Sequence, residues 1–478
     1  MSRIPGLQRI VVAALVLPAL AAAPALAASS STTEAKDQGS VTFYEDVLPI
    51  LQGSCQTCHR PNGANLGGMV APMAFTSYDE TRPWAKSIAQ KVAAREMPPW
   101  HASPAQAGVF ENERTLTDAE IATIVSWTKA GAPAGDAGKA PLPRQWPNVE
   151  GWQIGEPDLV LSIPEKYLVG DEIEDHYITF ETEITTDVLP EPRWARAIEF
   201  RPGSSVVHHI IALPLGGVAP GNDPTIHREG YGTLIKPGQV IRWQMHYHKE
   251  AGPGTAVWDL SQVALRFYPE GYQPTHVVQN APLGNMWFEI PAGDPNYSSQ
   301  VSYTLERDSR IVSLLPHAHV RGKGATYVAH YPDGTRETLL EVPEYDFNWQ
   351  TTYRFREEKL VPAGTRIELV MSWDNSADNP NNPNPNEIVT FGQPTTSEMM
   401  FGFMDFTDAE PGYLPKERMG FGARSQTADM DPREALRSFL GIDLESLNPA
   451  DRQRLIKSFM NNRRPGQGEE PGASSGRE

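Results

Sequence analysis

Apolar positions follow a helical spacing in the first part of the chain, between residues 41 and 132. The last helix of this region has clear boundaries. Thr117 is its predicted N-cap, Glu120 completes a capping box with Thr117, and Gly131 followed by Pro133 marks its end. The pattern predicts a small all-α domain over residues 41–132.

Between about residues 152 and 425, segments of alternating apolar and polar positions recur between Pro, Gly, Asn and Asp turns, as is typical of half-buried strands. Residues 331–334, Tyr-Pro-Asp-Gly, form a predicted hairpin turn between two such segments. Because the region to residue 425 is too long for one sandwich, we predict two antiparallel β-sandwich (jelly-roll) domains, over 152–280 and 281–425. The clearest alternating positions are Val263, Leu265 and Phe267, and then Ile367, Leu369, Met371 and Trp373.

Three other segments lack the pattern of a packed domain. Residues 28–40 are rich in Ser, Thr and Ala and are predicted to be disordered, and residues 133–151 form a Pro/Gly/Ala-rich linker. Residues 426–478 are predicted to contain a helical segment followed by a disordered tail.

The first 27 residues have the features of an export signal. Arg3 and Arg9 form a basic start, an apolar run covers residues 10–22, and Ala25-Leu26-Ala27 fits a cleavage site. We therefore expect a periplasmic or secreted protein without an integral membrane segment. An uncleaved anchor is the alternative.

The net charge of the chain argues against two classes of partner, nucleic acids and anionic membranes. Loss of the two signal arginines changes the formal net charge from −18 to −20. Nucleic acids and anionic membranes bind positively charged surfaces instead. We expect no nucleic-acid partner.

At 478 residues the chain has room for about three domains.

The two cysteines of the chain stand in one short motif, Cys55-Gln56-Thr57-Cys58-His59. C-x-x-C-H is the attachment motif of c-type haem, in which two thiols bind the haem covalently and the histidine ligates iron. A thioredoxin-like site would need a βαβ context, and a zinc site a second cysteine pair. The motif predicts one covalent haem c.

The sixth haem ligand should be a neutral sulfur or nitrogen before the final helix. Met97, in the proline-rich stretch Glu96-Met97-Pro98-Pro99-Trp100, is the favoured candidate, because Met/His ligation raises the potential for electron transfer. This segment resembles a class I cytochrome c. The rivals are Met69, Met73 and His101.

Six of the twelve histidines form three tight groups in the β region, at residues 208–209, 246–248 and 317–319. His317 and His319 face the same side of a strand and can bind one ion, whereas His208 and His209 can do so only at a bulge or a strand end. Imidazole with a thioether favours copper. The residues thus predict one or two copper sites, against the alternative of purely structural histidines.

The motifs Val-His-His, Gln-x-His-Tyr, His-x-His and a late Ser-Glu-Met, in this order, resemble the copper type II, ascorbate-dependent monooxygenases. That family includes peptidylglycine α-hydroxylating and dopamine β-monooxygenases. The resemblance covers about residues 155–425. It implies two jelly-roll domains, each contributing one copper across a solvent-filled cleft.

The resemblance also implies a ligand set. His208, His209 and His246 would hold an electron-storing copper. His317, His319 and Met399 would hold the oxygen-activating copper and form the catalytic centre, and Ser397-Glu398-Met399 favours Met399 over Met400. His248 shares a strand face with His246 and is a rival. The remaining β-region histidines match nothing and are interpreted as structural: His176, His227, His276 and His330.

Two departures from the family bear on the substrate. Peptide-specific members place an arginine just before His-x-His, where this chain has Leu314-Leu315-Pro316, and the methionine is followed here by Phe401-Gly402-Phe403. Both changes favour an uncharged or apolar substrate. Arg321 remains a candidate anion binder.

We therefore expect an enzyme that hydroxylates a C–H bond of a small organic molecule with O₂. The expected electron donor is an external cytochrome, a quinol-linked donor or an ascorbate-like reductant, acting through the attached haem. The alternatives are a haem/copper electron carrier without turnover, and a carbohydrate- or partner-binding sandwich fused to a cytochrome.

Overall fold

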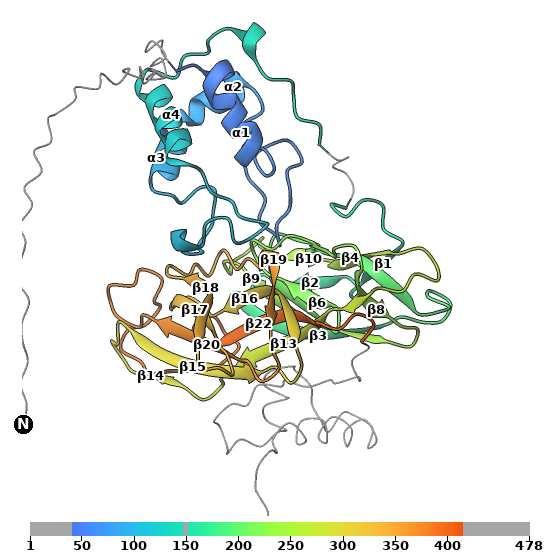
Figure 1. The fold of residues 1–478 in the computed structure, drawn as a ribbon. Coiled ribbons are helices and arrows are strands. Elements are labelled where there is room, and N and C mark those ends of the chain that lie inside the picture. The colour runs from blue at the N-terminus through green and yellow to red at the C-terminus, as the bar shows by residue number, and fades with distance from the viewer. Residues whose placement is uncertain (1–40, 147–151, 414–478) are drawn as a thin grey trace, which may run out of the picture. The chain divides into compact units, whose positions relative to one another are not determined.

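The computed structural model describes residues 41–146 and 152–413 (Figure 1). The predicted signal peptide (1–27), the stretch 28–40 and the C-terminal segment 426–478 lie outside the described residues, as does the end of the predicted linker.

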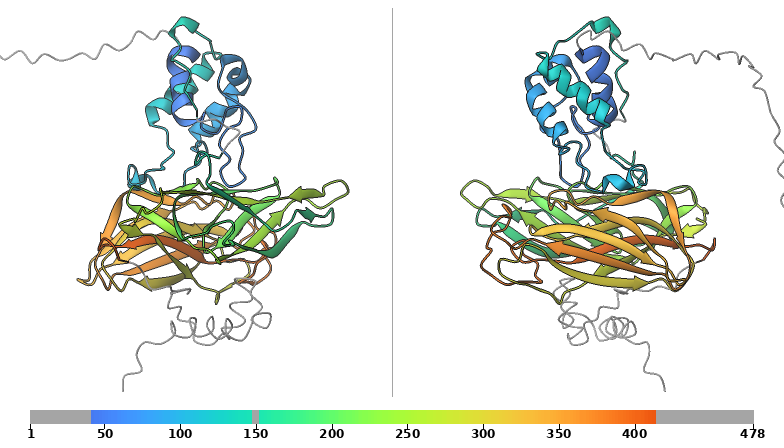
Figure 2. Two further views of the ribbon diagram at one scale, coloured as in Figure 1. Left: turned by 90° about the vertical axis from the view of Figure 1, so that its right-hand side faces the viewer. Right: turned by 60° about the vertical axis from the view of Figure 1, so that its left-hand side comes forward.

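Helices are short and lie together in one small group (Figure 2). Four are α-helical: α1 (Leu48–Ser54), α2 (Tyr78–Thr81), α3 (Ala85–Ala93) and α4 (Asp118–Lys129). Three one-turn elements belong to this group: η1 (Phe43–Val47), η2 (Arg82–Trp84) and η4 (Ala137–Lys139). A fourth, η3 (Pro104–Gln106), lies apart from it, where Gln106 bonds the backbone of Leu339 and Glu341.

Helix α4 has the predicted cap. The Thr117 hydroxyl accepts from the Glu120 backbone N–H, and the Glu120 carboxylate accepts from the Thr117 N–H at 2.8 Å. Gly131 has a φ of +87°, which an L-residue with a side chain adopts only at a cost, and it ends the helix. Ile124 and Trp127 are fully buried in the helical core. The capping prediction is confirmed.

In the part of the chain that the structure describes, the strands form four larger sheets and two small ones. The first large sheet has the order β1-β11-β4-β8-β12, with β7 beside β4. Its strands are β1 (Leu159–Ser162), β4 (Arg193–Arg201), β7 (Thr225–Ile226), β8 (Tyr231–Ile235), β11 (Gln262–Phe267) and β12 (His276–Val277). The second has the order β3-β9-β5-β6, from β3 (Asp175–Glu183), β5 (Val207–Leu213), β6 (Gly216–Val218) and β9 (Val240–His248).

The other two large sheets belong to the second half of the β region. One has the order β13-β22-β16-β19, from β13 (Gln279–Gly284), β16 (Ser309–His317), β19 (Tyr353–Val361) and β22 (Phe401–Asp408). The other has the order β15-β20-β17-β18, from β15 (Tyr297–Thr304), β17 (Gly322–His330), β18 (Arg336–Val342) and β20 (Arg366–Trp373). The two-stranded sheets pair β2 (Tyr167–Val169) with β10 (Val257–Asp259) and β14 (Glu289–Ile290) with β21 (Val389–Thr390).

Two large apolar cores separate these sheets. One is built from residues between Leu161 and Phe267, and the other mainly from residues between Ala281 and Phe406. Strand β20 shows why the alternation arises, since each of its odd-numbered positions is buried and each even-numbered one is only partly so. The predicted hairpin turn after Tyr331 is also present, between β17 and β18.

The predicted fold class is wrong. The chain is mostly β, with its four larger sheets arranged like a four-bladed propeller, and the described residues do not divide into a cytochrome-like domain and two jelly-roll domains. The reason is that alternation shows that a strand has one buried face but not which strand lies beside it. Strands β3 and β4 follow one another in sequence yet lie in different sheets.

The predicted domain boundaries stay predictions. Contacts group the described residues into one compact unit, beginning at Val41. Part of the predicted haem domain packs on strands: Phe110 pairs with Phe355 in an isolated bridge, and the Ser103 N–H donates to the Glu341 carbonyl at 2.8 Å.

Within residues 41–146 and 152–413, none of the helices has the length and apolar character that crossing a membrane would require.

Candidate metal centre

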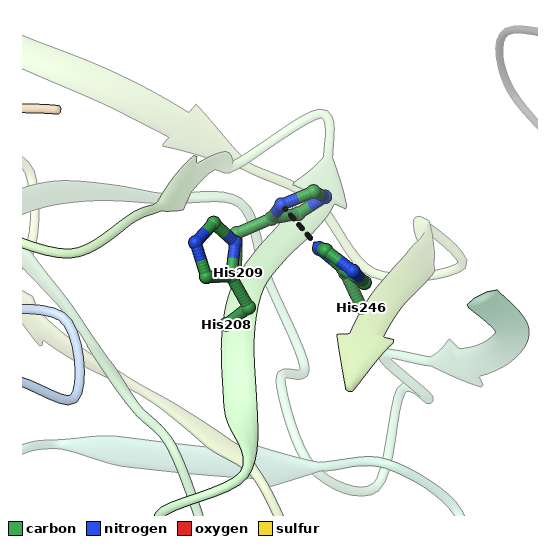
Figure 3. A group of neighbouring side chains, drawn as sticks. All are labelled: His208, His209 and His246. Carbon is green, nitrogen blue, oxygen red and sulfur yellow. Dashed lines mark hydrogen bonds between the residues drawn. The ribbon is translucent and has the colours of Figure 1, made fainter. Parts of the chain in front are cut away.

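The first histidine group lies on the neighbouring strands β5 and β9, where His209 pairs with His246 (Figure 3). The register of this pair shifts between Val207 and His209, so His208 occupies a bulge. A bulge breaks the alternation of side chains, and this allows two adjacent histidines to turn to one ion. One ligand atom from each of His208, His209 and His246 lies within 4.8 Å of the others.

The nitrogens of this group are placed as metal ligands would be. The Nδ1 atoms of His209 and His246 are 3.3 Å apart, and two nitrogens bound to one tetrahedral ion at about 2 Å would lie roughly 3.3 Å apart. A shared proton would satisfy this contact equally. The stronger evidence is that both ring nitrogens of His208 and Nε2 of His209 are buried without a hydrogen-bond partner.

Asp175 fixes the ring of His246. Its carboxylate accepts from His246 Nε2–H, which leaves Nδ1 as the lone-pair nitrogen. Although burial opposes ionisation, the hydrogen bonds from His246 and from Thr395 lower the pKa of Asp175 to about 2. The Thr395 N–H donates to the same carboxylate at 2.9 Å.

Two aromatic rings enclose the group. Tyr177 stacks on His246 with ring centroids 4.1 Å apart, and Phe347 stacks on His208 at 4.4 Å. Burial lowers the pKa of His208 and of His209 well below the ordinary value, so both rings are neutral at neutral pH. Neutral imidazole is the form that binds metals.

The rival His248 is not part of this group. It is exposed at the end of β9, and its ring centroid lies 6.4 Å from that of His246. Its neighbour Tyr247 points into the apolar core.

The second group lies at the end of β16. His317 is the last residue of the strand, and His319 follows two positions later with a ring centroid 5.6 Å away. The Nδ1 of His317 lies 2.6 Å from Gln350 Oε1, and the Nδ1 of His319 lies 3.1 Å from the Ser397 carbonyl. Both partners are hydrogen-bond acceptors, so each ring carries its proton on Nδ1 and presents Nε2 as its lone-pair nitrogen. His319 Nε2 is buried without a partner.

Burial also keeps this second pair of rings neutral. It lowers the pKa of His317 to about 4 and that of His319 to about 3. Among the described residues, no third histidine, cysteine or carboxylate completes a metal-binding group with them. A third protein ligand would therefore have to be of another type, such as a thioether.

Glu398 positions the segment that carries the predicted methionine. This buried carboxylate accepts the backbone N–H groups of His319 at 2.8 Å and of Met399 at 3.3 Å. It also accepts the Trp373 indole N–H at 3.1 Å. The backbone of Met399 thus lies beside His319, whereas Met400 is fully buried in the apolar core. Coordination by the Met399 sulfur stays a prediction.

The two groups lie side by side. The ring centroids of His209 and His317 are 6.2 Å apart, and Phe347, which stacks on His208, is 6.0 Å from His319. The solvent-filled cleft that the family resemblance implies does not separate these rings. Strands of both halves of the β region thus build one histidine cluster.

Arg321 does not face this cluster as a free cation. It is 2% exposed, its Nε donates to Asn375 and Asn382, and Nη1 donates to the Thr396 carbonyl. Its side chain therefore anchors the loop before Glu398.

The C-x-x-C-H segment follows helix α1. Both cysteines are free thiols, and burial raises the pKa of Cys55 to about 12 and also raises that of Cys58. His59 stacks on Phe75 at 4.4 Å, and its Nδ1 lies 3.1 Å from the Met73 carbonyl. Nε2 of His59 is again the lone-pair nitrogen, as a haem ligand requires.

Met97 lies on the loop after α3 and is 44% exposed. Among its rivals, Met69 is similarly exposed, Met73 packs against the helical core, and the partly buried His101 has an Nε2 without a partner. The sixth ligand stays a prediction.

The four histidines predicted to be structural have ordinary polar neighbours. His176 bonds the Tyr167 hydroxyl, His227 bonds the Thr233 hydroxyl, and His330 pairs with Glu368. His276 bonds Thr275 and stacks on Tyr231.

Sequence reasoning missed the residues that orient the rings, namely Asp175, Gln350, Phe347 and Tyr177. Asp175 and Tyr177 contact His246, Gln350 contacts His317, and Phe347 stacks on His208. In each of these pairs the two residues are more than 30 positions apart in the sequence. None of the four residues belongs to a motif. Only Glu398 was within a recognised pattern, as the middle residue of Ser-Glu-Met.

Comparisons with known proteins give no family. No family model matches the chain, and no curated protein matches it. A turret protein of Sulfolobus turreted icosahedral virus is 12% identical, over 52% of this chain and 98% of its own, with a TM-score of 0.13. The VP2 subviral particle of infectious bursal disease virus is 12% identical over 53% and 73%, with a TM-score of 0.15. Similarities this low carry no argument.

Proposed function

We propose that this chain is an exported copper-dependent monooxygenase. It hydroxylates a C–H bond of a small, uncharged or apolar organic substrate with O₂, and its electrons arrive through a covalently attached c-type haem. The external donor is a cytochrome, a quinol-linked donor or an ascorbate-like reductant.

One observation carries the proposal: histidines from three strands converge with lone-pair nitrogens that the protein leaves unused. His208, His209 and His246 fit one ion by their separation. His317 and His319 offer Nε2 to a second ion. Buried polar atoms without partners are rare in proteins, and a cluster of them is best explained by a bound metal.

The donor types favour copper. Three imidazoles suit copper, zinc, iron or nickel, whereas two imidazoles with the Met399 thioether favour copper, and Cu(I) in particular. Copper bound in these two sites supplies the single-electron steps and the oxygen chemistry that a C–H hydroxylation needs.

Hydrogen-bond acceptors of the protein keep the ring proton on the nitrogen that does not face the ion. Asp175, Gln350 and the Ser397 carbonyl each take the N–H of one ring, which fixes its tautomer and its orientation. Tyr177 and Phe347 each cover one ring face in the first group, on His246 and His208 respectively.

The surroundings of His317 favour an apolar substrate. Phe401 lies nearly parallel to the His317 ring at 6.4 Å, and Phe391 and Phe403 lie within 6.5 Å of Phe401. The nearby cation Arg321 is already bonded within the protein. A substrate carboxylate would find no free partner in this set.

Cys55, Cys58 and His59 would hold the haem. The high thiol pKa values keep both sulfurs protonated, as S–H groups that can add across haem vinyl groups. With Nδ1–H bonded to the Met73 carbonyl, His59 is oriented to ligate iron through Nε2.

A second candidate function is electron transfer without substrate turnover. It is favoured by the 6.2 Å separation of the His209 and His317 rings, which suits direct electron exchange between two ions.

Oxygen consumption separates the two functions. Copper-loaded protein, supplied with reductant, should consume O₂ and yield a hydroxylated product from a library of small organic compounds, and His317→Ala should abolish both. A parent protein that binds copper and is oxidised slowly, with no product from any compound, would support the electron carrier.

A further inference from the structure

The segment between β18 and β19 contacts all three candidate centres. Phe347 stacks on His208 of the first histidine group, and Gln350 Oε1 accepts from His317 Nδ1 of the second. Between them, Trp349 packs in one apolar cluster with Cys58 of the haem motif and with Leu66. Among the described residues, this segment alone has side chains at all three centres.

Trp349 is held rigidly in this position. The side chain is 9% exposed, and the backbone of Gly221 approaches its ring so closely that an added Cβ would lie 2.8 Å from it. The Gly221 N–H donates to the Leu66 carbonyl at 2.9 Å, and the Gln350 N–H donates to the Pro220 carbonyl at 2.7 Å. The indole is thus fixed between the helical region and the histidine cluster.

We propose that Trp349 is the electron-entry residue of the copper centre, bridging a haem on Cys58 to the copper at His317. This inference rests on the proposed function. The route runs from the Cys58 side chain through the packed indole, along the covalent bond to Gln350, and across the 2.6 Å hydrogen bond to the ring of His317. Electronic coupling is strongest through such bonds and contacts, and weakest across gaps.

One electron moves in each step. The haem iron is oxidised from Fe(II) to Fe(III), and the copper is reduced from Cu(II) to Cu(I); no bond is made or broken, and no proton moves. The external donor of the proposed function then reduces the haem again.

Trp349 acts as a bridge and is not itself oxidised. An oxidised indole is a cation, and the Arg114 guanidinium already lies 5.7 Å from the ring centroid. The buried indole N–H has no partner that could take its proton. Both features raise the free energy of an oxidised tryptophan.

The test is the rate at which haem is reoxidised. Protein with reduced haem is mixed with O₂, with and without copper loaded, and haem absorbance is followed by stopped flow. Copper should accelerate reoxidation in the parent. Trp349→Leu should reduce this acceleration at least several-fold, Trp349→Phe should retain most of it, and Trp258→Leu, at an exposed tryptophan of β10, should leave it unchanged.

Haem content, copper content and circular dichroism establish that each variant is intact. If Trp349→Leu does not fold, Gln350→Met tests the same route beyond the indole, because it removes the hydrogen bond to His317, and it should also slow reoxidation several-fold. Parent-like rates in folded, copper-loaded Trp349→Leu or Gln350→Met would overturn the role of Trp349 and leave the proposed function standing. No copper-dependent acceleration in the parent would overturn both.

Discussion

At the scale of single residues, the informative property is which nitrogen of each histidine ring the protein has already engaged. His246 donates a hydrogen bond from one ring nitrogen to Asp175, and His319 donates one to the Ser397 carbonyl. In both cases the other nitrogen is left with a lone pair. The same division is found at His276, whose Nε2 is also buried without a partner. It therefore favours metal binding only where several such rings converge, as His208, His209 and His246 do.

Asp175→Asn should weaken copper binding at the first group by about 10–100-fold. The Asp175 carboxylate orients the His246 ring and makes it a better electron-pair donor to the metal. The substitution removes this negative charge. A competition titration with a Cu(I) chelator measures the effect, in a His319→Ala background that removes the second site. Asp187→Asn, at an exposed position, is the matched control. Equal affinities in the two variants would contradict the role of Asp175.

The buried ring of His227 should make the free energy of unfolding depend on pH. Burial lowers its pKa to about 4 in the folded chain, against about 6.5 when unfolded. As the pH falls from about 6.5 to 4, the unfolded state takes up a proton that the folded state does not, so the free energy of unfolding decreases in this window.

Urea unfolding of the parent and of His227→Asn, at about pH 7 and about pH 5, measures this contribution. The parent should lose more stability than the variant between the two pH values. An equal loss in both would show that His227 is accessible to protons in the folded chain.

At this scale the sequence predicts the candidate ligands but not their partners. Histidine spacing predicted three groups of candidate ligands, and the family resemblance selected His208, His209 and His246 among them. The structure brings one ligand atom of each within 4.8 Å of the others. Asp175 could not be predicted, because 71 positions separate it from His246 and only the pairing of β3 with β9 brings them together.

At the scale of elements, a bulge and a short loop shape the site. The bulge in β5 turns His208 and His209 to one side of the sheet. The loop before β22 holds Met399 beside His319 through the Glu398 carboxylate. The spacing of residues predicted that adjacent histidines need a bulge, but it could not show that one forms, because register depends on the partner strand.

Met399 and Met400 should respond differently to truncation. Met400 is fully buried in the core, so Met400→Ala should lower the free energy of unfolding by about 2–5 kcal/mol while both copper ions remain bound. Met399→Ala should lose Cu(I) from the second group at a smaller cost in stability. Denaturant titration and metal analysis measure both. The opposite pattern would assign the thioether ligand to Met400.

Glu398→Ala should remove copper from the second group while the first group keeps its own. The backbone N–H groups of His319 and Arg321 would lose their common acceptor. Each buried donor left unpaired costs about 1–3 kcal/mol. Metal analysis of the purified variant checks the expected fall from two copper ions to one. Glu410→Gln, on an exposed carboxylate, is the control, and an unchanged copper content in Glu398→Ala would contradict the role of Glu398.

At the scale of the whole molecule, local patterns were a good guide to elements and a poor guide to architecture. The alternation at Ile367 to Trp373 predicted strand β20, and the capping box at Thr117 predicted helix α4. The fold class was wrong because periodicity does not specify which strands are neighbours. The packing of Trp349 in one apolar cluster with Cys58, 291 positions apart in sequence, was likewise beyond any local pattern.

The central claim is that this chain binds copper at two histidine groups and haem at one motif. Metal analysis with optical quantification of haem, on the purified chain after copper loading, tests this proposal. We expect two copper ions and one haem per chain, with a single copper ion retained in His209→Ala and likewise in His317→Ala. A parent protein that binds no copper, or variants that retain both ions, would contradict it.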